Sequence, residues 1–66
     1  MKVILNGTPH DLDDGASLAT AVANLTTATT GIAAAVNGEV VRQPSWSQTP
    51  LSDGDLVEVI TAVQGG

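Results

Sequence analysis

Residues 52–61, Ser-Asp-Gly-Asp-Leu-Val-Glu-Val-Ile-Thr, join a turn signal to the clearest strand pattern in the chain. Aspartate and glycine favour turns, and the run Leu56–Thr61 that follows is rich in β-branched residues, which favour strands. Successive side chains of a strand point to opposite faces. This alternation predicts that Val57 and Val59 face a core, whereas Ile60 faces outward. A strand therefore ends the folded part of the sequence.

Two Asn-Gly pairs, Asn6-Gly7 and Asn37-Gly38, divide the rest of the chain into hairpins. Asn-Gly favours the tight hairpin turn because both of its central residues need a positive φ. Each pair stands between two short runs that read as strands. The predicted strands before the last one are Lys2–Leu5, Thr8–Leu12, Ile32–Val36 and Glu39–Val41.

One helix is predicted between the two hairpins. Ser17 is a suitable N-cap, because its hydroxyl can accept a hydrogen bond from a free backbone N–H. The helix should end within Thr26–Gly31, where threonine and glycine disfavour continuation. An apolar stripe at helical spacing precedes that end. Its members are Leu18, Ala21, Val22 and Leu25.

The resulting order, β-β-α-β-β-β, predicts an α+β fold in which one main helix packs on one face of a mixed sheet. In the first strand, Val3 and Leu5 should face the helix, so that Ile4 joins Ile60 on the open face. A contiguous apolar patch there would mark a contact site. We expect residues 1–61 to form this domain and residues 62–66 to form a flexible C-terminal tail.

Composition excludes several classes of function. The 66 residues include no Cys, which rules out disulfides and thiolate metal sites, and His10 is the only His. Net charge is −5, with Lys2 and Arg42 as the only basic residues. That balance argues against nucleic acids and anionic membranes and favours a protein partner with a basic surface. Without Cys, a signal peptide or an apolar span, we expect a cytoplasmic protein.

Candidate catalytic groups are few. His10 reads as a partly exposed strand residue, and Asp11, Asp13 and Asp14 are either a metal cluster or, as we favour, solvated turn residues. A chain of 6.6 kDa also looks too small for a pocket of ~300 Å³ or more. Trp46, the only aromatic residue, is either a binding anchor or, as we favour, a cover over the core. We therefore do not expect an enzyme.

The C-terminus holds the one unusual chemical group. Residues 62–66 can span roughly 17 Å when extended, and Gly65 and Gly66 lack the Cβ that would block a narrow slot. The α-carboxylate of Gly66 is unreactive until it is activated, for instance by adenylation. Since the domain supplies no catalytic group for that step, the activator must be another protein.

These residues and motifs resemble the sulfur carrier proteins of thiamine biosynthesis, the ThiS family, over nearly the whole chain. The most specific part of the resemblance is the final run from Asp53 to Gly66. It implies the ubiquitin-like β-grasp fold. The segments that carry it are Met1-Lys2-Val3, Leu5-Asn6-Gly7, Asp14-Gly15-Ala16, Val36–Val41, Trp46, Thr49-Pro50-Leu51 and Asp53–Gly66.

The resemblance also implies partners and roles. An adenylyltransferase of the ubiquitin-activating type would use ATP to adenylate Gly66. Sulfur from cysteine, delivered by a desulfurase or sulfurtransferase, would convert the adenylate to a thiocarboxylate, and thiazole synthase would take that sulfur. Gly66 would carry the sulfur, Gly65 would give access, and the chain itself would bind no cofactor. The positions that could contact partners are Ile4, Ile60, Ala62, Val63 and Gln64.

Other readings of the tail stay open. A sulfur carrier for molybdopterin synthesis, a ubiquitin-like modifier that joins target lysines, and a plain interaction domain with an inert tail would share this order of elements. The chain also departs from the family pattern in the Thr-rich segment Thr26–Thr30 and in Arg42-Gln43-Pro44-Ser45. These departures lie away from the tail and bear on the contacts of the helix side.

Overall fold

The predicted order of elements is confirmed in the computed structural model, which describes residues 1–28 and 30–61. A short 3₁₀ helix, η1, lies between the last two strands. The elements are β1 (Lys2–Leu5), β2 (Thr8–Asp11), α1 (Leu18–Leu25), β3 (Ile32–Val36), β4 (Glu39–Val41), η1 (Gln43–Gln48) and β5 (Leu56–Thr61).

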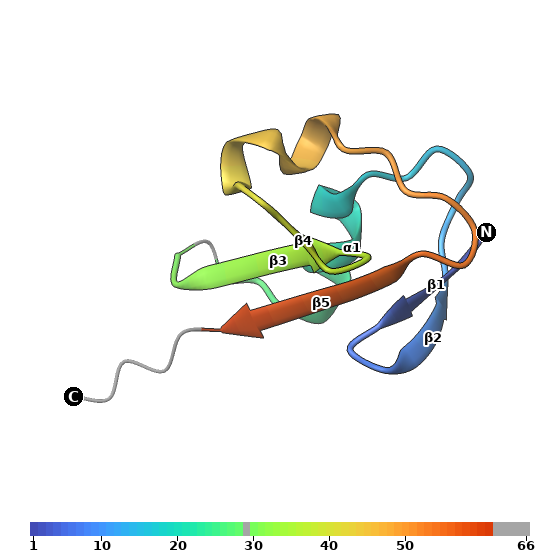
Figure 1. Ribbon diagram of the computed structural model, residues 1–66, viewed down its shortest axis with the longest axis horizontal. Helices are drawn as coiled ribbons and strands as arrows, with labels where there is room; N and C mark the ends of the chain where they lie inside the picture. Colours follow the sequence, from blue (N-terminus) through green and yellow to red (C-terminus); the bar gives the residue numbers. More distant parts are fainter. Residues whose placement is uncertain (29, 62–66) are drawn as a thin grey trace.

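The strands form one mixed sheet in the order β2-β1-β5-β3-β4, so the last strand of the sequence is the central one. It runs parallel to β1 and antiparallel to β3. Helix α1 lies on one side of this sheet (Figure 1). The α+β class, with one main helix on one face, is therefore confirmed.

Both Asn-Gly turns form as predicted. Asn6 and Gly7 have φ values of 49° and 84°, and Asn37 and Gly38 have 52° and 85°. Asparagine and glycine tolerate this left-handed region better than other residues. The second strand ends at Asp11, one residue before the predicted end at Leu12.

The helix begins at its predicted cap. The Ser17 Oγ accepts a hydrogen bond from the Thr20 N–H at 3.4 Å, and the helix ends at Leu25, before the Thr-rich segment. Leu18, Ala21 and Val22 are buried, which confirms most of the apolar stripe. The prediction for Leu25 was wrong, because this side chain is 37% exposed. As the last helical residue, it lies beyond the end of the core.

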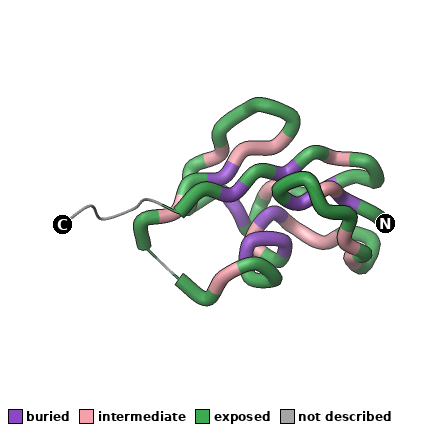
Figure 2. The backbone as a smooth tube through the Cα atoms, turned by 90° about the horizontal axis from the view of Figure 1, so that it is seen from below, coloured by how far each residue is buried: buried purple, intermediate pink, exposed green. Residues whose placement is uncertain are grey.

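The core lies between the sheet and the two helices, where the buried parts of the tube gather (Figure 2). Trp46 in η1 is 6% exposed and donates its indole Nε1–H to the Val41 carbonyl at 2.8 Å, which confirms its role as a cover over the core. Inward-facing strand residues are buried as predicted. The buried apolar residues are Val3, Leu5, Leu18, Ala21, Val22, Ala34, Trp46, Leu51, Val57 and Val59.

Candidate functional site

The C-terminal tail is joined to the central strand of the sheet. Strand β5 ends at Thr61, at the opposite end of the molecule from the N-terminus (Figure 1). Hydrogen-bonded neighbours flank this strand, so its direction is set by the sheet. The predicted sulfur-carrying and access residues Gly66 and Gly65, with Ala62, Val63 and Gln64, lie outside the described residues.

The two predicted contact residues of the domain, Ile4 and Ile60, lie on the same face of the sheet. Ile60 is 65% exposed, whereas Ile4 is half-buried. They are not direct neighbours. Ile4 is in register with Leu56, four positions before Ile60 on β5, which places the two isoleucines roughly 13 Å apart along the strand.

Residues that sequence reasoning missed fill this face. Leu56 is 54% exposed beside Ile4, and Val40 on β4 is 72% exposed opposite Ala35. Because Ala35 is also in register with Glu58, Val40 lies on the same face as Glu58. The open sheet face, as we call it, is the part of this side of the sheet that β5 and its neighbours form. It consists of Ile4, Leu56, Glu58, Ile60, Ala33, Ala35 and Val40, and Lys2, Pro9 and Asp11 continue the same side toward β2.

Two sequence signals could have extended the prediction to this patch. Leu56 shares the strand parity of Ile60, and the Asn37-Gly38 turn fixes the register that sets Val40 opposite Ala35. No local signal in the sequence predicted that Leu56 lies beside Ile4, because the parallel pairing of β1 with β5 joins the two ends of the sequence.

The open sheet face has a carboxylate near its middle. Glu58 is exposed, between Leu56 and Ile60 along β5. Glu58 helps to line a hollow of about 200 Å³ together with Ile4 and Leu56. A second hollow, of about 310 Å³, is lined in part by Ala33 and Ile60. Such a surface suits a partner that is mostly apolar and carries one cationic group opposite Glu58.

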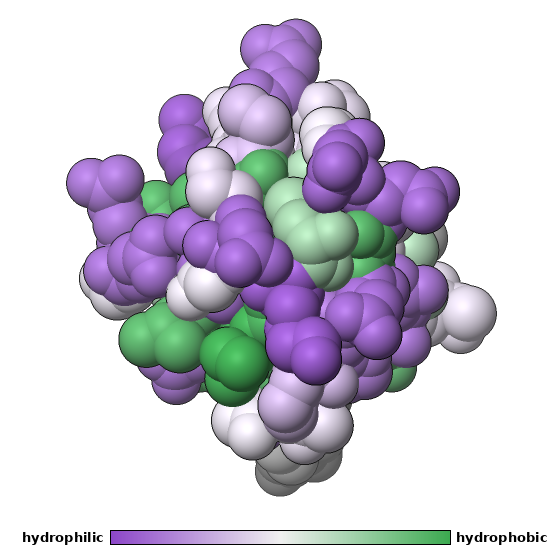
Figure 3. Space-filling view, turned by 90° about the vertical axis from the view of Figure 1, so that its right-hand side faces the viewer, coloured by the Kyte–Doolittle hydropathy of each residue, from purple (hydrophilic) through white to green (hydrophobic). Residues whose placement is uncertain are grey.

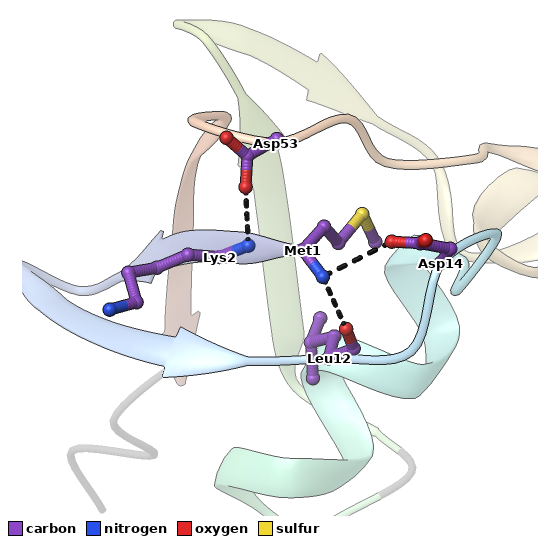
Figure 4. Close-up of polar contacts among 5 residues, drawn as sticks. All are labelled: Met1, Lys2, Leu12, Asp14 and Asp53. Atoms are coloured by element: carbon purple, nitrogen blue, oxygen red, sulfur yellow. Dashed lines mark hydrogen bonds and ion pairs between the residues drawn. The ribbon is translucent and has the colours of Figure 1, made fainter.

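Two other acidic residues, Asp14 and Asp53, have structural partners (Figure 4). The ammonium group of Met1 donates to the Leu12 carbonyl at 2.8 Å and to Asp14 Oδ1 at 3.2 Å. Asp53 Oδ1 accepts from the Lys2 backbone N–H at 2.7 Å. The turn before β5 is therefore fastened to β1, and these carboxylates hold the fold in addition to being solvated.

A hollow of about 470 Å³ adjoins Asp11, Asp13 and Asp14. We expected the chain to be too small for a pocket of ~300 Å³ or more, and the volume of this hollow shows that this prediction was wrong. Because this hollow lies on the surface around a loop, it does not need room inside the core. Within residues 1–28 and 30–61, no three His, Asp or Glu side chains gather closely enough to hold a metal ion. His10 is half-buried on β2, as predicted.

The surface at the N-terminal end differs from the open sheet face. Figure 3 shows mainly hydrophilic side chains there, with apolar ones in small separate groups. Neither helix of the described chain is long and apolar enough to cross a membrane.

Comparison with known proteins places this arrangement in a family. The model of the ThiS family matches residues 3–66. The chain belongs to the ThiS family. Its members are small sulfur carrier proteins of thiamine biosynthesis, not catalysts, and they act with an activating enzyme and a thiazole synthase. The resemblance of the sequence to this family, and the ubiquitin-like β-grasp fold that it implies, are thus confirmed.

Two solved structures are similar over the full chain. The crystal structure of a thiamine biosynthesis protein (ThiS) from Geobacter metallireducens has 28% identity, a TM-score of 0.78 and complete coverage of both chains. A solution NMR structure of a thiamine biosynthesis protein from the same organism has 29% identity and a TM-score of 0.74, covering 100% of this chain and 88% of that one. A search of curated proteins gave no match.

Proposed function

We propose that this ThiS-family chain carries sulfur as a thiocarboxylate on Gly66 for the synthesis of the thiamine thiazole. The observation that carries the proposal is the extent of the family match, which runs through Gly65 and Gly66 to the end of the sequence. The tail follows directly from a central strand, so a docked domain can deliver this terminus in one direction.

The chemistry takes place on enzymes that bind the chain. Within an adenylyltransferase of the ubiquitin-activating type, a Gly66 carboxylate oxygen attacks the α-phosphate of ATP, and pyrophosphate leaves. The terminal sulfur of a persulfide, formed from cysteine on a desulfurase or sulfurtransferase, then attacks the acyl carbon, and AMP leaves. A thiol attacks the sulfur–sulfur bond of the acyl disulfide so formed, which releases the thiocarboxylate and leaves a disulfide. Thiazole synthase accepts the sulfur from the resulting thiocarboxylate.

In this proposal each part of the chain has its own role. Residues 1–61 form the docking domain and residues 62–66 the tail. Gly65 and Gly66 pass through a slot that a Cβ would block. Ala62, Val63 and Gln64 contact the walls of the partner's channel. Gly66 alone changes covalently.

The open sheet face is the proposed docking surface for the adenylyltransferase. Of the four large apolar side chains that are exposed in the described chain, three lie on it: Leu56, Ile60 and Val40. Exposed apolar side chains that gather on one face favour an interaction site there. Two of the three belong to β5, so docking there and delivery of the tail involve the same strand.

The net charge of the chain indicates which kind of partner surface can bind it. The net charge of −5 favours a partner with a basic rim, and it disfavours nucleic acids and anionic membranes. The proposed location is the cytoplasm, where ATP and the partner enzymes would be available. The chain itself uses neither ATP nor a metal as its own cofactor.

Intact-mass analysis tests the proposal. The purified chain is incubated with a ThiS-type adenylyltransferase, ATP, a cysteine desulfurase and cysteine. We expect a mass increase equal to the replacement of one oxygen by sulfur, and no increase in a variant that lacks Gly66. An unchanged mass in the wild type would overturn the proposal.

The same method, applied to cell extracts, separates the alternatives. Covalent adducts of the chain on other proteins would indicate a ubiquitin-like modifier. A gene deletion whose growth defect is relieved by thiamine supports our assignment, whereas one that instead removes molybdopterin would indicate the other carrier class.

A further inference from the structure

A side chain from the first hairpin turn completes the pairing of β5. The Val59 N–H donates to Asn6 Oδ1 at 2.8 Å, and Asn6 Nδ2 donates to the Val59 carbonyl at 3.1 Å. Both hydrogen bonds are partly buried. The primary amide of Asn6 therefore occupies the place that a further residue of β1 would take beside β5.

Within the described residues, these hydrogen bonds of Asn6 are the last ones on the side of β5 that faces β1. The β1–β5 ladder ends at the pair of Leu5 with Val57, and the Asn6 N–H adds a bond to the Val57 carbonyl at 2.9 Å. On the other side, β3 continues to the end, with Ile32 opposite Thr61. Without the Asn6 amide, residues 58–61 would be held mainly by β3. A two-stranded ribbon twists more and is less stable than a wider sheet.

The second Asn-Gly turn offers an internal comparison. Asn37 has nearly the same φ as Asn6, 52° against 49°, and it too reaches β5 from the neighbouring hairpin. Its Oδ1 accepts from the Leu56 N–H at 3.0 Å, and its Nδ2 donates to Asp55 Oδ1 at 3.1 Å. Asn37 thus fastens the beginning of β5, whereas Asn6 fastens the part nearest the tail.

We propose that Asn6 is a positioning residue, whose side-chain amide holds the last residues of β5 in the sheet and so fixes the direction in which the tail leaves Thr61. This inference rests on the proposed function, because the direction matters only if Gly66 must enter an activating enzyme. Small errors in the placement of a reacting group reduce the rate steeply. A docked carrier with a loosened β5 end would present Gly66 correctly for a smaller fraction of the time.

The test compares Asn6→Gly with Asn37→Gly. Glycine tolerates the positive φ at both positions, so each variant keeps its turn and loses only the amide. Activation is measured as exchange of labelled pyrophosphate into ATP, catalysed by a ThiS-type adenylyltransferase at increasing carrier concentration. The assay temperature is kept well below both unfolding midpoints. Amide hydrogen exchange of Val59 and Val57 is followed in the same proteins.

We expect Asn6→Gly to lower kcat between about 5-fold and about 100-fold at saturating carrier. Asn37→Gly should change kcat less than about 2-fold, which is within the scatter that comparisons between single variants commonly show. The Val59 amide, which loses its acceptor, should exchange faster in Asn6→Gly alone, with Val57 little affected. Asn6→Asp, which keeps Oδ1 and loses the Nδ2 donor, should fall between the wild type and Asn6→Gly.

Several results would overturn the inference. A raised KM with unchanged kcat would make Asn6 a docking contact, since it borders the open sheet face. Equal losses of kcat in both glycine variants would point to a general loss of stability. Faster exchange at Val59 with normal kcat would show that the end of β5 need not be held. If the wild type shows no exchange of pyrophosphate, the proposed function fails first.

Discussion

Ile4 and Leu56 lie side by side on the open sheet face, joined by the parallel register of β1 and β5. Ile4 is half-buried and Leu56 is more than half exposed, so the two form an apolar surface patch rather than part of the core. The pair lies at one end of the face and Ile60 at the other, with Glu58 between them. This arrangement lets hydrophobic and electrostatic contributions to docking be tested separately.

Replacing Leu56 with glutamate should weaken docking and leave the fold intact. Loss of one well-placed apolar contact costs about 1–2 kcal/mol of binding, which corresponds to a rise in KM for activation of roughly 5- to 30-fold. The free energy of unfolding should change by no more than about 0.5 kcal/mol, as for most surface sites. The control is Ala23→Glu on the exposed side of α1, and equal effects of both variants on KM would place the docking surface elsewhere.

Reversing the charge of Glu58 should slow association. In Glu58→Lys, the carboxylate proposed to face a cation of the partner becomes a like charge, which lowers the association rate and its dependence on salt. Glu39→Lys makes the same change at another exposed strand residue, on β4. Stopped-flow measurements at low and moderate salt should show a larger loss for Glu58→Lys. A similar loss at both sites would mean that net charge alone steers the encounter.

Neighbouring residues of β5 should differ sharply in their effect on stability. Val59 is buried whereas Ile60 is exposed. Val59→Ala should lower the free energy of unfolding by about 1–3 kcal/mol, through lost apolar burial and the space left behind. Ile60→Ala should cost no more than about 0.5 kcal/mol. Urea denaturation measures both, and an unchanged midpoint for Val59→Ala would contradict the assignment of this position to the core.

Local patterns in the sequence predicted the elements well. The Asn6-Gly7 and Asn37-Gly38 turns set the hairpins, because few residues other than Asn and Gly accept their φ values. The alternation in β5 predicted which valines are buried. The end of α1 followed from the Thr-rich segment, whereas the exposure of Leu25 did not follow from the apolar stripe. These features depend on neighbours within a few positions.

Features that depend on the pairing of distant segments could not be predicted in the same way. The contact of Ile4 with Leu56 needs the parallel register of β1 with β5. The bonds of Asn6 to Val59 and of Asp53 to Lys2 also join the two ends of the sequence. A turn asparagine and a turn aspartate already have a local explanation, so nothing in the pattern pointed to these second roles.

Trp46 should contribute to stability through its indole N–H as well as its bulk. Trp46→Phe keeps an aromatic ring but removes the donor to the Val41 carbonyl. An acceptor left without its partner costs about 1–3 kcal/mol when it is not rehydrated. Thr49→Val removes a different hydrogen bond, to the exposed Ser45 carbonyl, and should cost less. Denaturation followed by circular dichroism compares the two, and equal losses would assign the effect to η1 as a whole.

Removing Gly66 should abolish activation without destabilising the domain. Within residues 1–28 and 30–61, the buried core runs from Val3 to Val59, and we expect the fold not to depend on the last residue. Deletion of Gly66 moves the terminal carboxylate back by one residue, roughly 3.3–3.6 Å, and out of reach of the α-phosphate of ATP. Adding one Ala after Gly66 is the matched variant, because it keeps both glycines and displaces the carboxylate forward. We expect neither variant to be adenylated and both to melt at the wild-type temperature. Normal pyrophosphate exchange in either would show that Gly66 is not the activated residue, and a large fall in the melting temperature would assign the tail a structural role.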